Sequence, residues 1–221
     1  MKNMENNIKN RNIKNKKSYF FFKRCFDLFF SSLSILIFAL PMLIIGIIVK
    51  STSKGPMIFK DPRIGKNKKI INVFKFRSMY IDAETNIDKY LTKEQKEIWN
   101  RERKLENDPR ITKFGKFIRK TSLDELPQLF NIFIGQMSFV GTRPITIHEL
   151  EDNFTNDEQK IIVSGKPGLT GYWQVYGRGS AEYDDGERQK LELEYYYKRG
   201  FFFDLKLIIL TIPAVFKAKG A

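Results

Sequence analysis

The sequence predicts an α+β protein in which an N-terminal re-entrant helical hairpin in the membrane is joined to a compact, mostly helical cytosolic domain with a small sheet. Three observations lead to this fold class. Residues 28–49 form a run of 22 residues without a charge. The remaining residues, 51–221, contain no second uninterrupted run of that length. The composition, 42% hydrophobic and 29% charged, is sufficient for a buried core.

The residue counts restrict the chemistry that the chain can carry out. There is one cysteine, Cys25, and one histidine, His148, among 221 residues. An internal disulfide, a Cys/His zinc site and catalysis by two histidines are therefore excluded. An active site would depend on carboxylates, Lys and Arg, hydroxyls and a metal held by oxygen. The net charge of +14 indicates a polyanionic partner, which is nucleic acid, an anionic membrane surface or a phosphorylated small molecule.

The positive charge is concentrated at the N-terminus. Residues 1–24 hold eight Lys or Arg and one acid, Glu5, and so carry half of the net charge. The first 18 residues are rich in Asn and Lys and poor in apolar side chains. We expect residues 1–24 to form a basic disordered tail.

The uncharged run is long enough for a membrane, and a buried core helix is the alternative interpretation. As a helix, Leu28–Val49 would extend about 33 Å, against a hydrocarbon core of about 30 Å. Pro41 interrupts it, and proline removes a helical hydrogen bond and clashes with the preceding turn. Basic residues flank both ends of the run, and the positive-inside rule places such flanks in the cytoplasm. Residues 25–50 therefore fit a re-entrant helix turning at Pro41, although a kinked spanning helix is also open.

Residues 51–221 are expected to form one catalytic domain. Alternation of apolar residues predicts a strand at Ile70–Met79, and a highly charged segment, 81–107, predicts a surface helix that is a candidate lid. Three further helices are expected: Phe114–Arg119, Glu125–Ile134, and a core or interfacial helix that starts at Phe201 and ends near Pro213.

The first chemical motif is a pair of adjacent acids, Asp124 and Glu125. One interpretation is structural, because Ser122 and Glu125 have the spacing of a capping box. The other is functional, because the partial positive charge at a helix N-terminus lowers the pKa of a carboxylate. Such a carboxylate stays ionised and can attack phosphorus or hold Mg²⁺. Basic residues around the pair favour the functional interpretation, since they suit the transfer of a phosphate group. They are Lys75, Arg77, Lys113, Lys116, Arg119, Lys120 and Arg143.

The second motif is the glycine-rich segment Gly165–Gly179, GKPGLTGYWQVYGRG. It predicts a loop whose backbone approaches a ligand closely. Its aromatic residues, Tyr172, Trp173 and Tyr176, suit either stacking on a base or packing in the core. Motifs typical of other nucleotide enzymes are absent from the sequence, including the P-loop, the dinucleotide fingerprint and the D-x-D metal clamp.

Four segments occur in a characteristic order after the apolar run: K-F-R-S-M, S-L-D-E-L-P-Q-L-F-N, M-S-F-V-G-x-R-P and P-G-L-T-G-x-x-Q-V-x-G-R. In this order they resemble the bacterial sugar transferases, the monotopic phosphoglycosyl transferases that load undecaprenyl phosphate. The resemblance covers roughly Phe22 to Thr211, and the chain is similar to the minimal form of the family.

The resemblance implies an activity and a location. A sugar 1-phosphate would move from a UDP-sugar to undecaprenyl phosphate, with release of UMP, at the cytoplasmic face of the bacterial inner membrane. Asp124 would be the nucleophile that forms a covalent phosphosugar intermediate, and Glu125 would assist it. Mg²⁺ would bind near Asp124. The resemblance also implies the re-entrant form of the membrane segment, turned at Pro41.

The resemblance also suggests how the substrate is held. Lys75, Arg119 and Arg143 match phosphate-handling positions, and Arg77 joins them because it lies in the same K-F-R-S-M segment. The nucleotide and sugar are assigned to the glycine-rich segment, at Pro167, Gly168, Thr170, Gly171, Gln174 and Arg178. The chain departs from the family pattern at four positions, which are Leu40 before Pro41, Thr142, Glu192 and Lys198, and these departures leave the role of Glu192 open.

The expected partners are a UDP-sugar, undecaprenyl phosphate and membrane lipids, without nucleic acid. Two alternatives remain, a membrane-tethered nucleic-acid binder that uses the basic tail and an inactive scaffold for glycan assembly. A homodimer and contacts with downstream glycosyltransferases are compatible with the main hypothesis, and the sequence decides neither. It also does not specify the sugar or the glycan.

Overall fold

The structure is a computed structural model that describes residues 17–217, except 84, 103–104, 106, 178–180 and 182. The chain divides into two compact units, which we describe separately. Unit 1 takes its described residues from Met1–Ile35, Pro62–Val73 and Gln128–Lys219. Unit 2 takes its described residues from Leu36–Asp61 and Phe74–Pro127. The division expected at residues 24 and 50, into tail, membrane segment and catalytic domain, stays a prediction.

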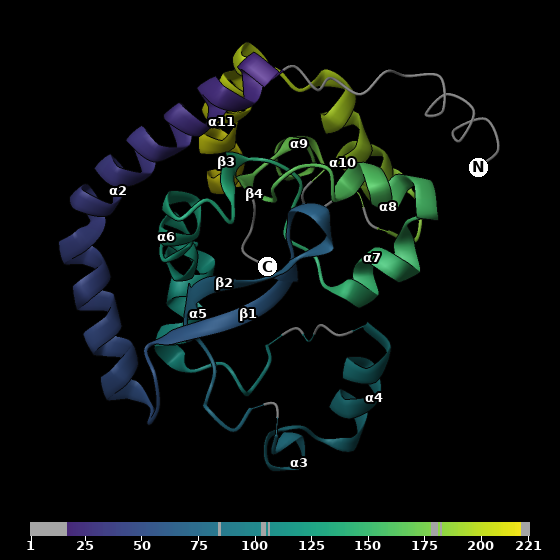
Figure 1. The fold of residues 1–221 in the computed structure, drawn as a ribbon. Coiled ribbons are helices and arrows are strands. Elements are labelled where there is room, and N and C mark those ends of the chain that lie inside the picture. The colour runs from purple at the N-terminus through teal and green to yellow at the C-terminus, as the bar shows by residue number, and fades with distance from the viewer. Residues whose placement is uncertain are drawn as a thin grey trace. The chain divides into compact units, whose positions relative to one another are not determined.

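The longest element is the helix α2, Lys17–Thr52, of 36 residues (Figure 1). It is long and apolar enough to cross a membrane, and only 22% of its most hydrophobic window is buried. A buried core helix is therefore wrong for this segment. One expectation needs correction, because residues 17–24 are helical rather than disordered. Helix α2 continues through Pro41 as one element and bends along its length (Figure 1). The re-entrant form of this segment stays a prediction. The rest of the predicted tail, residues 1–16, lies outside the described residues.

Two small sheets replace the single small sheet that the sequence predicts. Strands β1 (Ile58–Ile64) and β2 (Ile70–Phe76) pair across a short connection that holds the 3₁₀ turn η1 (Lys66–Lys68). The strand expected over Ile70–Met79 is thus confirmed, although it ends earlier. Strands β3 (Ser138–Val140) and β4 (Gly168–Thr170) pair in parallel, with Ser138 opposite Gly168 and Val140 opposite Thr170.

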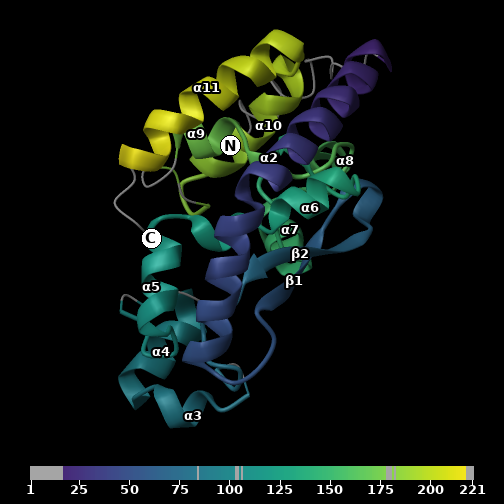
Figure 2. The ribbon, with the colours of Figure 1, turned by 90° about the vertical axis from the view of Figure 1, so that its left-hand side faces the viewer.

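Unit 1 is built mainly from helices around one apolar core. The helices are α6 (Gln128–Phe133), α7 (Ile147–Asn153), α8 (Asn156–Ile162), α9 (Tyr172–Tyr176), α10 (Glu187–Lys198) and α11 (Phe201–Lys217). Val140, Leu150, Leu193, Tyr196 and Leu207 are nearly fully buried in the core. The first turns of α2 lie beside the start of α11 (Figures 1 and 2), where the rings of Phe26 and Phe201 meet edge to face. α11 continues past Pro213, so its expected end there is wrong.

Unit 2 has its own core, formed around the second half of α2. Met42, Ile45 and Val49 of α2 pack with Phe76 of β2 and Ile118 of α5. The unit also contains α3 (Ile87–Tyr90), α4 (Lys93–Glu102), α5 (Lys113–Lys120) and the 3₁₀ turn η2 (Leu123–Glu125). The charged segment 81–107 is thus two short helices rather than one, whereas the helix expected at Phe114–Arg119 is confirmed as α5.

Candidate active site

The acidic pair lies on η2, a single 3₁₀ turn. The expected capping box is wrong, because Ser122 has a left-handed backbone (φ 56°, ψ 17°) and its side chain makes no capping hydrogen bond. A left-handed backbone at a residue other than glycine costs roughly 1–3 kcal/mol and is found preferentially at functional sites. Leu123 and Leu126 pack against the core of unit 2 and hold the turn in place. The acids therefore stand on a strained but anchored turn.

The environment of Asp124 makes its carboxylate more basic than usual. Burial, together with the negative charge of Glu125, raises the pKa of Asp124 to about 6 against the opposing charges of Arg119 and Lys75. The expectation of a lowered pKa is wrong, because three residues of 3₁₀ helix supply little of the dipole that a longer helix provides. At neutral pH the carboxylate is ionised and poorly solvated, which suits a nucleophile or a metal ligand.

Two cations in unit 2 act on this carboxylate. Lys75 Nζ bonds the Asp61 carboxylate at 2.9 Å, and Arg119 Nε donates to Ser78 Oγ at 2.8 Å. The close approach of α5 to Ser78 depends on Gly115, where a Cβ would lie 1.9 Å from the Ser78 carbonyl oxygen. The K-F-R-S-M segment therefore supplies one cation and orients the other.

Arg77, also expected at the phosphate, has structural contacts. Its Nη atoms donate to the carbonyl oxygens of Ser53 (2.7 Å) and Lys54 (2.8 Å), just beyond the end of α2. The backbone of Gly55 has φ 117°, and a Cβ there would lie 2.2 Å from Arg77 Nη1. Arg77 thus ties the chain that leaves α2 to the end of β2. Its contact with phosphate stays a prediction.

The glycine-rich segment belongs to unit 1 and is more regular than expected. It forms strand β4 and helix α9 instead of a loop. Glycine is required by close backbone contacts, because a Cβ on Gly168 would lie 2.1 Å from Gly141 N, and one on Gly171 would lie 1.9 Å from Gly141 O. The segment therefore packs on the turn that holds Arg143. The structure brings together Pro167, Gly168, Thr170, Gly171 and Gln174, while Arg178 lies outside the described residues.

The aromatic residues of this segment divide between the two interpretations. Trp173 is buried, and its Nε1 donates to the Ala181 carbonyl oxygen at 3.1 Å, so it belongs to the core. The Tyr172 ring contacts that of Tyr176 at 4.7 Å, and Tyr176 is exposed. Of the three, Tyr176 has the accessibility that stacking on a base requires.

A second buried acid, Glu192, lies beneath the Arg143 turn. Its carboxylate oxygens accept from Arg143 N at 3.3 and 3.4 Å, and burial raises its pKa to about 7 against the opposing charge of Arg188. The guanidinium groups of Arg143 and Arg188 lie 5.7 and 4.3 Å from the ring centroid of Trp173. The sequence leaves the role of Glu192 open. The pattern that could have placed it at this turn is its position on α10, four residues after Arg188 and three before Tyr195.

Several buried polar atoms in unit 1 have no hydrogen-bond partner among the described residues. They include Gln174 Oε1, Tyr183 Oη and Arg188 Nε. Buried polar groups are normally paired, so orphaned atoms beside a predicted ligand segment are typical of a site that a polar ligand completes. This observation agrees with the assignment of Gln174 to the nucleotide or sugar.

The described residues contain no group of three or more His, Cys, Asp or Glu placed to hold a metal ion. The adjacent acids Asp124 and Glu125 nevertheless fit Mg²⁺, which is commonly bound through one or two carboxylates together with substrate phosphates. The predicted residues thus fall into two sets. Asp124, Glu125, Lys75, Arg77 and Arg119 lie in unit 2, whereas Arg143 and the glycine-rich segment lie in unit 1.

The chain is similar to several curated bacterial proteins. It is 47% identical over 167 residues to a galactosyl transferase CpsE from Streptococcus agalactiae serotype III, covering 76% of this chain and 36% of that protein. It is 39% identical over 208 residues to an undecaprenyl-phosphate galactose phosphotransferase from Salmonella typhimurium, covering 93% of this chain and 43% of that protein. It is 37% identical over 201 residues to the exopolysaccharide production protein ExoY of Rhizobium meliloti, covering 90% of this chain and 87% of that protein.

The chain thus spans less than half the length of the first two relatives and most of the third. The model of the bacterial sugar transferase family matches residues 18–218. The chain belongs to the bacterial sugar transferase family.

Proposed function

We propose that this bacterial sugar transferase is a phosphoglycosyl transferase that moves a sugar 1-phosphate from a UDP-sugar to undecaprenyl phosphate, releases UMP and thereby initiates a lipid-linked glycan. The observation that carries the proposal is the half-buried Asp124 beside Glu125 on a strained turn, within the electrostatic influence of Lys75 and Arg119. The Salmonella relative, an undecaprenyl-phosphate galactose phosphotransferase, supports the substrate class.

The first step is attack of an Asp124 carboxylate oxygen on the β-phosphorus of the UDP-sugar. An acyl phosphate bond to the sugar phosphate forms, the pyrophosphate bond breaks, and UMP leaves with the bridging oxygen. The poor solvation that raises the pKa of Asp124 also makes its ionised form a better nucleophile. Lys75 and Arg119 oppose the negative charge of the phosphates.

The second step transfers the sugar phosphate to the lipid. Glu125 takes the proton of the acceptor phosphate, an acceptor oxygen attacks phosphorus, and the bond to Asp124 breaks, which regenerates the carboxylate. Mg²⁺, held by Asp124 and Glu125, would neutralise charge on the diphosphate. The arrangement explains why two acids are adjacent, since each has a different task.

Unit 2 also explains how the reaction reaches a membrane lipid. The turn that bears Asp124 packs through Leu123 and Leu126 on the core formed with the second half of α2. The same part of α2 exposes other apolar side chains, which are Leu40, Leu43, Ile44 and Ile47. We therefore propose that this segment is embedded in the lipid, so that a phosphate at the membrane surface is accessible to Asp124.

The experiment that tests the reaction is a single turnover without the lipid acceptor. We expect a burst of one UMP per enzyme with a suitable UDP-sugar and Mg²⁺, and a sugar phosphate on the peptide that contains Asp124. A matched Asp124→Asn variant should give neither signal. A burst without covalent label, or UMP release that requires lipid in the first turnover, would contradict the two-step mechanism.

The topology has its own test. We propose that α2 enters and leaves the membrane on the cytoplasmic side, as the basic residues near both ends suggest. In a Cys25→Ser background, single cysteines at Lys17 and Lys54 should both react with an impermeant thiol reagent only from the cytoplasmic side. Reaction of the two positions from opposite sides would show instead that α2 spans the membrane.

A further inference from the structure

Unit 1 contains a cavity whose lining is strongly cationic. Its volume is ≈ 160 Å³, roughly ten times the minimum that a buried water requires. It is lined by Tyr19, Phe20, Lys23, Arg24, Asp27, Lys66, Ser138, Val140, Gly165, Lys166, Tyr195 and Arg199. Five of these side chains are Lys or Arg and one is an acid, so the cavity favours an anion.

The contacts around the cavity leave this positive charge in excess. Asp27, the acid in the lining, accepts from Ser138 Oγ and Phe139 N, both at 3.0 Å. Arg24 donates to the carbonyl oxygens of Ile132 and Phe133, which carry no net charge. Burial and the neighbouring charge of Arg24 lower the pKa of Lys166, as expected where cations repel one another.

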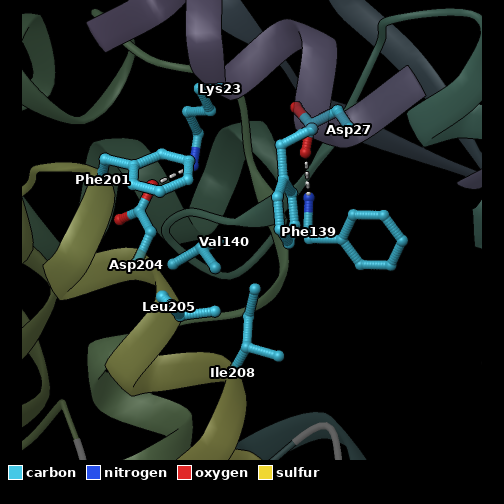
Figure 3. Close-up of a pocket in the computed structure, with 9 residues that line it drawn as sticks. Lys23, Asp27, Phe139, Val140, Phe201, Asp204, Leu205 and Ile208 are labelled. Atoms are coloured by element: carbon cyan, nitrogen blue, oxygen red, sulfur yellow. Dashed lines mark hydrogen bonds and ion pairs between the residues drawn. The ribbon is translucent and has the colours of Figure 1, made fainter. Parts of the chain in front are cut away.

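An apolar crevice adjoins the cationic cavity and shares Lys23, Asp27 and Val140 with it. Its remaining lining is Phe26, Phe139, Phe201, Asp204, Leu205 and Ile208. Figure 3 shows Lys23 and Asp204 pointing toward each other at one end of the crevice, and their ion pair measures 2.5 Å. Lys23 lines both spaces, whereas Asp204, Leu205 and Ile208 line only the crevice.

The surface beside these cavities is apolar. Phe21, Phe22 and Phe29 of α2 are exposed, as is Phe202 of α11, whose exposed fraction is 83%. Exposed aromatic side chains together with Lys and Arg are typical of a surface at the level of lipid headgroups. A ligand of these cavities would therefore come from the membrane.

We propose that the cavity and crevice form one site for an anionic phospholipid, with its phosphate among Lys23, Lys66 and Lys166 and the start of an acyl chain against Leu205 and Ile208. The opposite chemistries of two adjoining spaces fit an amphiphile better than a free anion. None of the lining residues belongs to unit 2, which holds Asp124. The site therefore differs in its residues from the proposed catalytic carboxylates and does not depend on the proposed function.

Native mass spectrometry of the full chain in neutral detergent tests the headgroup contacts, with phosphatidylglycerol as the probe. A Lys66→Glu/Lys166→Glu variant should lower its affinity at least tenfold. The matched control is Lys69→Glu/Lys160→Glu, which makes the same charge change on exposed lysines outside the cavity. Both variants carry the same net charge and keep the basic residues before Lys17. If phosphatidylglycerol binding falls equally in the two variants, it depends only on net charge, and the proposal is overturned.

The crevice is tested by Leu205→Trp, which fills it from its exposed side, against Ile209→Trp, an exposed residue outside the lining. Only the first should weaken phosphatidylglycerol binding, while both retain the wild-type melting temperature. Phosphatidylcholine and inorganic phosphate should bind at least tenfold more weakly than phosphatidylglycerol. Equal binding of inorganic phosphate would show a free-anion site, and binding of undecaprenyl phosphate alone would show a substrate site. Either result would overturn the proposal.

Discussion

Asp124 in unit 2 and Glu192 in unit 1 are carboxyl groups whose pKa values are both raised by loss of solvent. Their surroundings differ. Asp124 is half-buried on a three-residue turn, whereas Glu192 is 2% exposed within the twelve-residue helix α10. Asp124 is influenced by Lys75 and Arg119, and Glu192 accepts the backbone N–H of Arg143. A raised pKa alone therefore does not identify a nucleophile, and access to substrate distinguishes the two acids.

The largest expected effect is that of Asp124→Asn on activity. An amide cannot form the acyl phosphate, so UMP release should fall by a factor on the order of 10³ or more. Glu192→Asn is the control that tests whether loss of any acid with a raised pKa abolishes UMP release. This variant should retain measurable turnover. Comparable losses in the two variants, with both proteins folded, would remove the distinction between the two carboxyl groups.

The same Asp124→Asn substitution should stabilise the fold at neutral pH. Because the folded pKa lies above the unfolded value of 3.8, wild-type stability falls as the pH rises from about 4 to about 6 and stays lower above that. Removing the ionisable group should increase the free energy of unfolding by about 1–2 kcal/mol at pH 7.5, after allowance for partial exposure. Thermal unfolding at pH 4 and 7.5 measures this, and an equal effect at both values would contradict the assigned cause.

Glu192→Gln should have a smaller effect, mainly on substrate binding. The amide retains an oxygen that can accept from Arg143 N but loses the charge beneath Arg143 and Arg188. We expect kcat/KM to fall about tenfold, largely through KM, since the change displaces a turn and not the nucleophile. Steady-state kinetics with a UDP-sugar measure this. A large loss in kcat at unchanged KM would assign Glu192 a direct part in the chemistry.

The pH dependence of UMP release should separate Glu125 from Asp124. In the wild-type enzyme, activity should fall as the pH drops below about 6, because Asp124 must be ionised to attack. Glu125→Gln removes a charge that raises the pKa of Asp124, so the acidic limb should move to lower pH in first-turnover rates. If the acidic limb of the pH profile does not move in Glu125→Gln, the titration that it reports belongs to a group other than Asp124.

The smallest expected effect is at Ser122. Glycine tolerates the left-handed backbone at this position, so Ser122→Gly should stabilise the protein by about 0.5–1 kcal/mol. Ser122→Val, with a β-branched side chain, should destabilise it by about 1–2 kcal/mol. Chemical denaturation compares the two variants, and a destabilising glycine would show that the turn carries no backbone strain.

Much of the local structure could be predicted from the sequence. The long apolar helix, the strand that starts at Ile70 and the helix α5 follow from hydrophobic pattern, and these elements depend on interactions between neighbouring residues. Helix α2 runs through Pro41 as one element, because one missing hydrogen bond does not end a helix whose other residues favour it. The glycine-rich segment was expected to be a loop, but its glycines instead allow β4 and α9 to pack closely on the turn at Gly141.

The sequence by itself determined the family, the long apolar helix and the acidic pair, because ordered motifs, an uncharged run and two adjacent acids are local properties of the chain. Only the tertiary structure decided the charge state and partners of these groups. Burial raised the pKa of Asp124 where the helix dipole was expected to lower it, and packing placed Glu192 under Arg143, 49 residues away in the sequence. Desolvation and long-range contacts depend on which segments fold together, which no local pattern records.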